Sequence, residues 1–161
     1  MAESGVSWAV RRANAADIPR LLELRKDLVR SRGRKDEALI ARMVAACRTY
    51  FERAIPAGEF LGWLAEADGK AVGTAGLVIH SVPPTVRNLP GREGYIMNMY
   101  VVPEWRRHGI ARDLLVAVLD FLRAEGVPQV SLHATPDGRH LYEQSGFADS
   151  HELRLRLAPP D

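Results

Sequence analysis

The stretch RRHGIARDLL, at 106–115, places three cationic or potentially cationic side chains before a glycine and then begins an apolar stripe. The stripe predicts a helix, and the first four backbone N–H groups of any helix lack acceptors within it. Glu104 is a poor cap, and the Trp, Arg, Arg and His that follow it offer no side-chain oxygen. A bound anion would accept these protons, because a helix start combines free donors with the positive end of the helix dipole. Water around a short 3₁₀ turn is the alternative.

Two small residues suit this helix start to a phosphate. Gly109 allows a phosphate to approach the backbone, and Ala111 keeps the first turn uncluttered. Arg106 and Arg107 would add charge-assisted hydrogen bonds. The spacing fits neither the P-loop, which needs Gly-Lys-Ser/Thr, nor the G-x-G-x-x-G dinucleotide fingerprint.

The composition predicts one soluble globular domain over 1–161, with 47% hydrophobic and 26% charged residues. The net charge is only +2, from 22 basic and 20 acidic residues, which is too balanced to favour nucleic acid or an anionic membrane as the main partner. No apolar run reaches the ~18 residues that span a bilayer. The opening MAESGVSWAVRR lacks the pattern of a signal peptide. We therefore expect a cytoplasmic location.

The single cysteine, Cys47, lies in the helical-looking stretch ARMVAACRTYF. We interpret it as a small buried core residue rather than a reactive thiol. No histidine or second cysteine stands at ligand spacing from it, so we expect no metal site.

The hydrophobic periodicity predicts the element order β-α-α-β-β-β-α-β-α-β. A DG pair at 68–69 predicts a hairpin, and the stretch GYIMNMYVVP predicts a buried interior strand on which Tyr95, Met97 and Met99 share one face. The strand, helix and strand between 94 and 135 predict one crossover connection. The expected strands are 6–13, 59–67, 70–80, 94–102, 129–135 and 151–157; the expected helices are about 14–32, 36–54, 106–125 and 137–146; and 81–93 is an exposed loop.

Three motifs together resemble the GNAT superfamily of N-acyltransferases. The stretch MYVVPEWRRHGIARDLL resembles its acyl-CoA-binding motif, with Val-x-Pro-Glu followed by Arg/Gln-x-x-Gly-x-Gly/Ala. LHATPDGRHLYEQSGF looks like the family's fifth strand and following helix, and RRANAADIPRLLEL is similar to its usual first strand and helix. The matches cover nearly the whole chain in the right order. In the first motif the matching residues are Val101, Val102, Pro103, Glu104, Arg106, Gly109 and Ala111.

This resemblance implies an α/β (α+β) fold with a mixed, mostly antiparallel central sheet of about six to seven strands and about four flanking helices. It implies that the 94–102 strand splays from the 129–135 strand, and that the pantetheine arm of acetyl-CoA pairs with main chain in this slot. Many members have Asn where this chain has Thr135 and Ala where it has Gly138, and the Thr135 hydroxyl could still reach the pantetheine. The implied cofactor-binding residues are Met99, Tyr100, Val101, Arg106, Arg107, His108, Gly109, Ile110, Ala111, Arg112 and Thr135.

The resemblance also implies transfer of an acetyl group to a primary amine by direct attack in a ternary complex. Tyr142 matches the family's tyrosine that faces the thioester sulfur, and a phenol with a pKa of ~10 can donate a proton at neutral pH. Its alternative role is to pack its ring between helix and sheet. A backbone N–H near Met99 or Tyr100 would stabilise the developing oxyanion.

The general base and the acceptor remain open at this point. Glu93, His133 and a water relay are the candidate bases, and Asn98 could align a water or the acceptor. We expect a small-molecule or peptide amine as acceptor, and the alternating stretch HELRLRL could pair across a homodimer. A non-catalytic sensor or interaction module that binds acyl-CoA is the alternative function.

Overall fold

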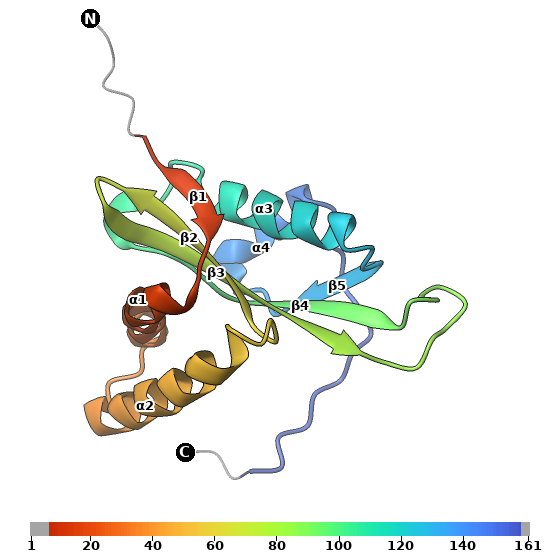
Figure 1. The fold of residues 1–161 in the computed structure, drawn as a ribbon, viewed down its shortest axis with the longest axis horizontal. Coiled ribbons are helices and arrows are strands. Elements are labelled where there is room, and N and C mark those ends of the chain that lie inside the picture. Colours follow the sequence, from red (N-terminus) through yellow and green to blue (C-terminus); the bar gives the residue numbers. More distant parts are fainter. Residues whose placement is uncertain (1–6, 159–161) are drawn as a thin grey trace, which may run out of the picture.

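In the computed structural model, which describes residues 7–158, a single five-stranded sheet carries helices on both faces (Figure 1). Short 3₁₀ turns at Ala15–Asp17 and Pro103–Trp105 precede the first and third helices. The elements are β1 (Ala9–Arg12), α1 (Ile18–Ser31), α2 (Glu37–Ala54), β2 (Leu61–Ala67), β3 (Lys70–Ser81), β4 (Arg92–Val101), α3 (Ile110–Ala124), β5 (Gln129–Leu132) and α4 (Pro136–Gln144).

The strands lie in sequence order across the sheet, and only the last pair is parallel. The predicted hairpin at 68–69 is confirmed: Asp68 and Gly69 have φ values of 50° and 73°, as a two-residue turn with two left-handed residues requires. The predicted interior strand is confirmed as β4, which lies between β3 and β5. Its link to β5 runs through α3, because parallel neighbours need a crossover connection.

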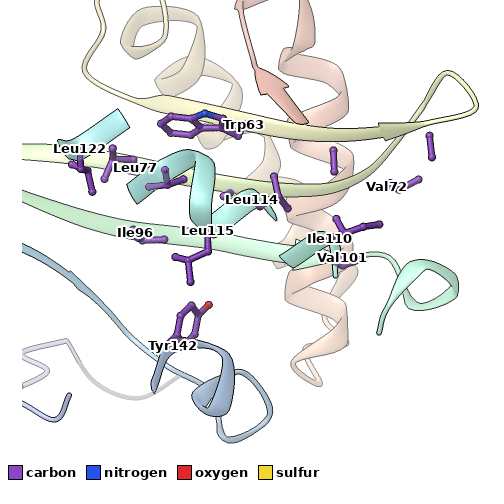
Figure 2. Close-up of a cluster of buried hydrophobic side chains, with 14 of the residues drawn as sticks. Trp63, Val72, Leu77, Ile96, Val101, Ile110, Leu114, Leu115, Leu122 and Tyr142 are labelled. Carbon is purple, nitrogen blue, oxygen red and sulfur yellow. The ribbon is translucent and has the colours of Figure 1, made fainter. Parts of the chain in front are cut away.

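Each face of the sheet has its own hydrophobic core, and Figure 1 shows the helices that lie on the two faces. On one face Leu114, Leu115 and Val118 of α3 are fully buried against the sheet, and Figure 2 shows Leu114 and Leu115 in this core. On the other face α1 and α2 pack on the sheet, and the rings of Phe51 and Phe60 lie 4.8 Å apart between centroids. Burying each such side chain contributes about 1.5–3 kcal/mol, so both helical layers are held firmly on β4.

Several sequence predictions differ from the structure. The third helix begins at Ile110 rather than near 106, because Arg107 and Gly109 have φ values of 65° and 97°, which a helix cannot include. The strand expected over 129–135 ends at Leu132. The expected strand at 151–157 is wrong, and the sheet has five strands rather than six to seven.

The C-terminal correction has a physical reason. Alternation of leucine with charge predicts a strand only where a neighbouring strand accepts its hydrogen bonds and one face is buried. Leu153, Leu155 and Leu157 are 99%, 81% and 89% exposed, so no face of this segment is covered within the described residues. No helix of the described chain is long and apolar enough to cross a membrane.

A buried carboxylate ties β1 to α1 and β2. Asp17, at the start of α1, is 5% exposed, and both its oxygens accept from the Arg11 guanidinium at 2.7 and 2.8 Å. Asn14 N donates to the same carboxylate, and Arg11 also contacts Glu66 of β2. The Arg11 guanidinium, as the largest influence, lowers the pKa of Asp17 to about 2. The arrangement fixes where α1 begins.

We expect Asp17→Asn to lower the free energy of unfolding at pH 7 by roughly 2 kcal/mol. The folded pKa lies below the unfolded value of ~3.9, so the carboxylate contributes its full stability above about pH 4 and loses it as the pH falls towards 2. Urea unfolding at pH 7 and at about pH 2 measures both values. Asp120→Asn, in an exposed pair with Arg123, is the control and should change stability by less than ~1 kcal/mol. An equal loss for Asp17→Asn at both pH values would contradict the assignment.

Candidate active site

On the side of β4 that faces β5, hydrogen-bonded pairing stops halfway along the strand. Pairing with β5 runs from Glu93↔Gln129 to Ile96↔Leu132, whereas β4 continues to Val101. Within the described residues, no strand pairs with this side of Met97–Val101. Backbone N–H and C=O groups seek partners, and an extended ligand with amide groups can supply them by pairing as an added strand.

An extra residue in β4 lies within this unpaired stretch. Thr74 of β3 pairs with Tyr100 and Gly76 pairs with Met97, so Asn98 and Met99 together oppose one residue of β3. Asn98 takes up the bulge with φ 56°, a left-handed conformation that asparagine tolerates better than most residues. Met97 consequently packs in the α1/α2 core and Met99 against the α3/α4 core. Our expectation that these methionines share a face is therefore wrong.

The start of α3 lies just beyond the end of β4, and its backbone donors lack protein acceptors. Within the described chain, none of the six amides from Arg107 to Arg112 donates to a protein oxygen, and Gly109 at the N-cap has no side-chain cap. The first amide with an acceptor is that of Asp113, which donates to Gly109 O at 3.1 Å. The shortage of acceptors predicted from the sequence is confirmed. Six adjacent free N–H groups at a helix start can bind an anion.

Some side chains around this helix start brace it, and others are exposed beside the free amides. Arg106 Nε donates to Val101 O at 2.9 Å, and the Arg106 guanidinium lies 5.6 Å from the centre of the Tyr100 ring. Arg106 therefore holds the connection on the end of β4. Trp8 Nε1 donates to Asp113 Oδ2 at 2.9 Å and anchors the first turn of α3. The exposed side chains beside the free amides are Arg107, His108 and Arg112.

Tyr142 projects from α4 into the α3/α4 core. The residue is 8% exposed, and Figure 2 shows its side chain pointing from α4 towards Leu115 and the sheet. Burial raises the pKa of Tyr142, and the positive charge of Arg32 at the end of α1 acts in the opposite direction. The phenol therefore stays protonated at neutral pH and can serve as a proton donor.

Thr135 and Gly138 shape the first turn of α4. Thr135 Oγ1 accepts from the amide of Gly138 at 3.3 Å, which leaves the hydroxyl hydrogen free to donate elsewhere. A Cβ at position 138 would lie 3.2 Å from Cε2 of Tyr142, a closer contact than is usual. Glycine here gives the Tyr142 ring its space, which accounts for one departure from the resemblance.

The two candidate bases occupy different ends of the β4–β5 pair. Glu93 pairs with Gln129 where the strands first meet, roughly 17 Å along the strand from Asn98 at ~3.4 Å per residue. The structure does not bring Glu93 to Tyr142 or to the bulge. His133 is exposed and directly follows Leu132, the last paired residue of β5.

Arg25, which no sequence pattern singled out, reaches the bulge. Arg25 on α1 donates from Nε to Cys47 Sγ at 3.0 Å and from Nη1 to Asn98 Oδ1. Cys47 is half-buried at this contact rather than in the deep core. The available signal was an arginine placed between Leu24 and Leu28, at the margin of the apolar face of α1. Among the described residues, no three His, Cys, Asp or Glu side chains gather as a metal site would require.

The sequence profile described as "Acetyltransferase (GNAT) family" matches residues 21–147. The chain belongs to the GNAT acetyltransferase family. It is therefore an acetyltransferase, and acetyl transfer from acetyl-CoA is general for the family. No curated protein matches this GNAT sequence significantly.

Solved structures agree with this family over almost the whole chain. A GCN5-related N-acetyltransferase from Ralstonia eutropha has a TM-score of 0.85 and 27% identity, covering 95% of this chain and all (100%) of its own. A predicted acetyltransferase with acetyl-CoA from Clostridium acetobutylicum has a TM-score of 0.84 and 30% identity, over 94% and 97% of the two chains. An aminoglycoside N-acetyltransferase in complex with CoA shares the fold at a TM-score of 0.71 and 20% identity, over 98% and 99%.

The β-bulge of this GNAT chain gives a stability prediction. Asn98→Ala and Asn98→Gly both remove the acceptor of Arg25, but only alanine must enter the left-handed region with a Cβ. We expect the alanine variant to be less stable than the glycine variant by roughly 1 kcal/mol. Chemical denaturation of the two proteins measures this difference directly. Equal stabilities, or a more stable alanine variant, would show that the bulge places no such demand on the residue.

Proposed function

We propose that this enzyme transfers the acetyl group of acetyl-CoA to a primary amine by direct attack within a ternary complex. The observation that carries the proposal is the run of free amides at 107–112, located beyond the end of the unpaired edge of β4. An acetyl-CoA molecule has a diphosphate for the first feature and an amide-bearing pantetheine arm for the second. The relative from Clostridium acetobutylicum was solved with acetyl-CoA, which supports this choice of acyl donor.

The residues present fit this co-substrate. The amides of Arg107 to Arg112, which include those of His108, Gly109, Ile110 and Ala111, would hold the diphosphate, and helix dipole and free donors contribute ~0.3–1 kcal/mol per anionic group. Main-chain groups of Met99, Tyr100 and Val101 would pair with the pantetheine arm. Thr135 would donate its remaining hydroxyl hydrogen to the same arm. Arg106 would act by bracing the loop, since it already bonds Val101.

When bound, the thioester supplies an acetyl group on a thiolate leaving group. The amine nitrogen forms a bond to the acetyl carbon as the carbon–sulfur bond breaks, so the amine loses one proton and the thiolate gains one. Tyr142 would donate the proton to the thiolate and recover one from solvent. A backbone N–H of Met99 or Tyr100, held at the bulge, would stabilise the negative charge on the carbonyl oxygen.

The proton lost by the amine has two short routes to solvent. His133 lies directly after the last β5 residue that pairs with β4, and a water relay needs no dedicated side chain. Glu93 would need a chain of waters to reach the bulge from the other end of the paired strands. A cytoplasmic location and a homodimer stay predictions from the sequence.

A matched pair of glycine variants tests the diphosphate site. Gly109 and Gly126 stand at opposite ends of α3 with φ values of 97° and 66°, and at neither would a Cβ meet an atom closer than 3.9 Å. Alanine at either position strains the backbone by roughly 1–2 kcal/mol, but only position 109 lies among the free amides. We expect Gly109→Ala to weaken acetyl-CoA binding about 10-fold and Gly126→Ala to leave it unchanged. Calorimetric titration measures both affinities, and equal effects of the two variants would rule out the α3 start as the diphosphate site.

Removal of one hydroxyl tests the proton donor. Tyr142→Phe keeps the ring that packs under α3 but cannot protonate the departing thiolate. We expect kcat to fall by roughly 10²- to 10⁴-fold while the Kd for acetyl-CoA stays within about twofold. A thiol-release assay measures kcat, and calorimetric titration measures the Kd for acetyl-CoA. A Tyr142→Phe variant that retains full turnover would show that Tyr142 is only a packing residue. A wild-type protein that binds acetyl-CoA without transferring the acetyl group would favour the alternative of a non-catalytic acyl-CoA sensor.

A further inference from the structure

The guanidinium of Arg25 lies at the bulge in a cluster with Cys47 and Asn98, and none of these three residues is assigned to acetyl-CoA binding. Arg25 bonds Cys47 Sγ through Nε and Asn98 Oδ1 through Nη1, so α1, α2 and β4 all meet at its guanidinium. A guanidinium has five N–H donors, and these two bonds leave three for another partner. Arg25 is half-buried, and its planar fork is therefore held in one place at the sheet.

Arg25 has no carboxylate partner within the part of the chain that the structure describes. The acids nearest to it on α1 interact with other cations: Glu23 lies 2.5 Å from Lys26 and Asp27 lies 3.9 Å from Arg30. A half-buried charge that lacks an opposite charge is unfavourable, and an incoming anion relieves it.

The cluster lies on the side from which the acceptor would approach. The start of α3 and Tyr142 belong to the α3/α4 face, so the proposed acetyl-CoA site lies on that side of β4. The opposite side of the bulge is covered by α1 and α2 (Figure 1), where Met97 packs and Arg25 reaches Asn98.

We propose that Arg25 binds a carboxylate of the acceptor, and that the acceptor is an amino acid with a free carboxylate. The inference rests on the proposed acetyl transfer. A guanidinium fork matches a carboxylate in geometry and charge. The Arg25 guanidinium touches the bulge directly, through its hydrogen bond to the Asn98 side chain. The amine and the carboxylate must therefore lie within a few bonds of each other. A polyamine or another multiply cationic acceptor would meet Arg25 as a like charge.

Thiol release with matched acceptors tests the proposal on the wild-type enzyme. Each standard amino acid is compared with its carboxamide and with the amine that lacks the carboxyl group, at saturating acetyl-CoA. We expect the preferred acid to exceed its carboxamide in kcat/KM by roughly 10- to 100-fold, the value of a charge-assisted hydrogen-bonded pair. Comparable values for acid, carboxamide and amine would overturn the role of Arg25 and leave the acetyltransferase proposal standing.

Variants of Arg25 then test whether this side chain distinguishes the acid from its carboxamide. Arg25→Gln should raise KM for the acid by roughly 10- to 100-fold and change the carboxamide little, and Arg25→Lys should recover part of the loss. Arg30→Gln on the same helix, where Arg30 pairs with Glu37 at the surface, is the matched control and should leave both acceptors unchanged. An equal loss with acid and carboxamide would indicate a merely structural role and overturn the proposal. If the wild-type enzyme acetylates no amine, the proposed function and this inference both fail.

Discussion

The proposed site depends on backbone N–H and C=O groups that have no hydrogen-bond partner in the described part of the folded chain. Main-chain N–H and C=O groups in a folded protein nearly always have partners, yet here two neighbouring stretches are short of them within the described chain, even though Val101 O accepts from Arg106. One is the edge of β4 beyond Ile96, and the other is the start of α3. Only the short turn at Pro103–Trp105 and the residues beside it separate the two. An acyl carrier that bears both amides and phosphates would satisfy both stretches at once, which is the basis of the proposed acetyl-CoA site.

Free backbone groups remain in place only if the elements that carry them are rigid. The α3 helix is seated by Ile110, whose Cγ2 would lie 3.0 Å from a Cβ at Gly73, so the glycine allows close approach of helix and strand. Arg106 and Trp8 hold the connection and the first turn by hydrogen bonds to Val101 and Asp113. The glycine-permitted packing and the two braces therefore fix the direction in which the free amides point.

Patterns of neighbouring residues in the sequence were enough to predict many of the helices and strands. The DG pair and the capped, periodic stretch at 36–54 specify their elements through neighbours in sequence, and both formed as expected. The bulge at Asn98 depends instead on the register against β3, which no local pattern records. The 151–157 segment shows the converse, because its alternation is local but a strand also needs a partner edge. Arg25 was missed for the same reason as the bulge, since its importance comes from Cys47 and Asn98, which are distant in sequence.

The bulge also gives the two faces of the sheet different side chains at the proposed site. A regular strand would send Met97 and Met99 to the same side, whereas the extra residue turns Met97 towards α1 and α2 and leaves Met99 facing α3 and α4. The same residue supplies Asn98, which links the backbone at the point of proposed chemistry to a cation on α1. The net charge of +2 conceals this local asymmetry. The proposed charge selection at the acceptor face would therefore depend on one strand irregularity and the single guanidinium that it holds.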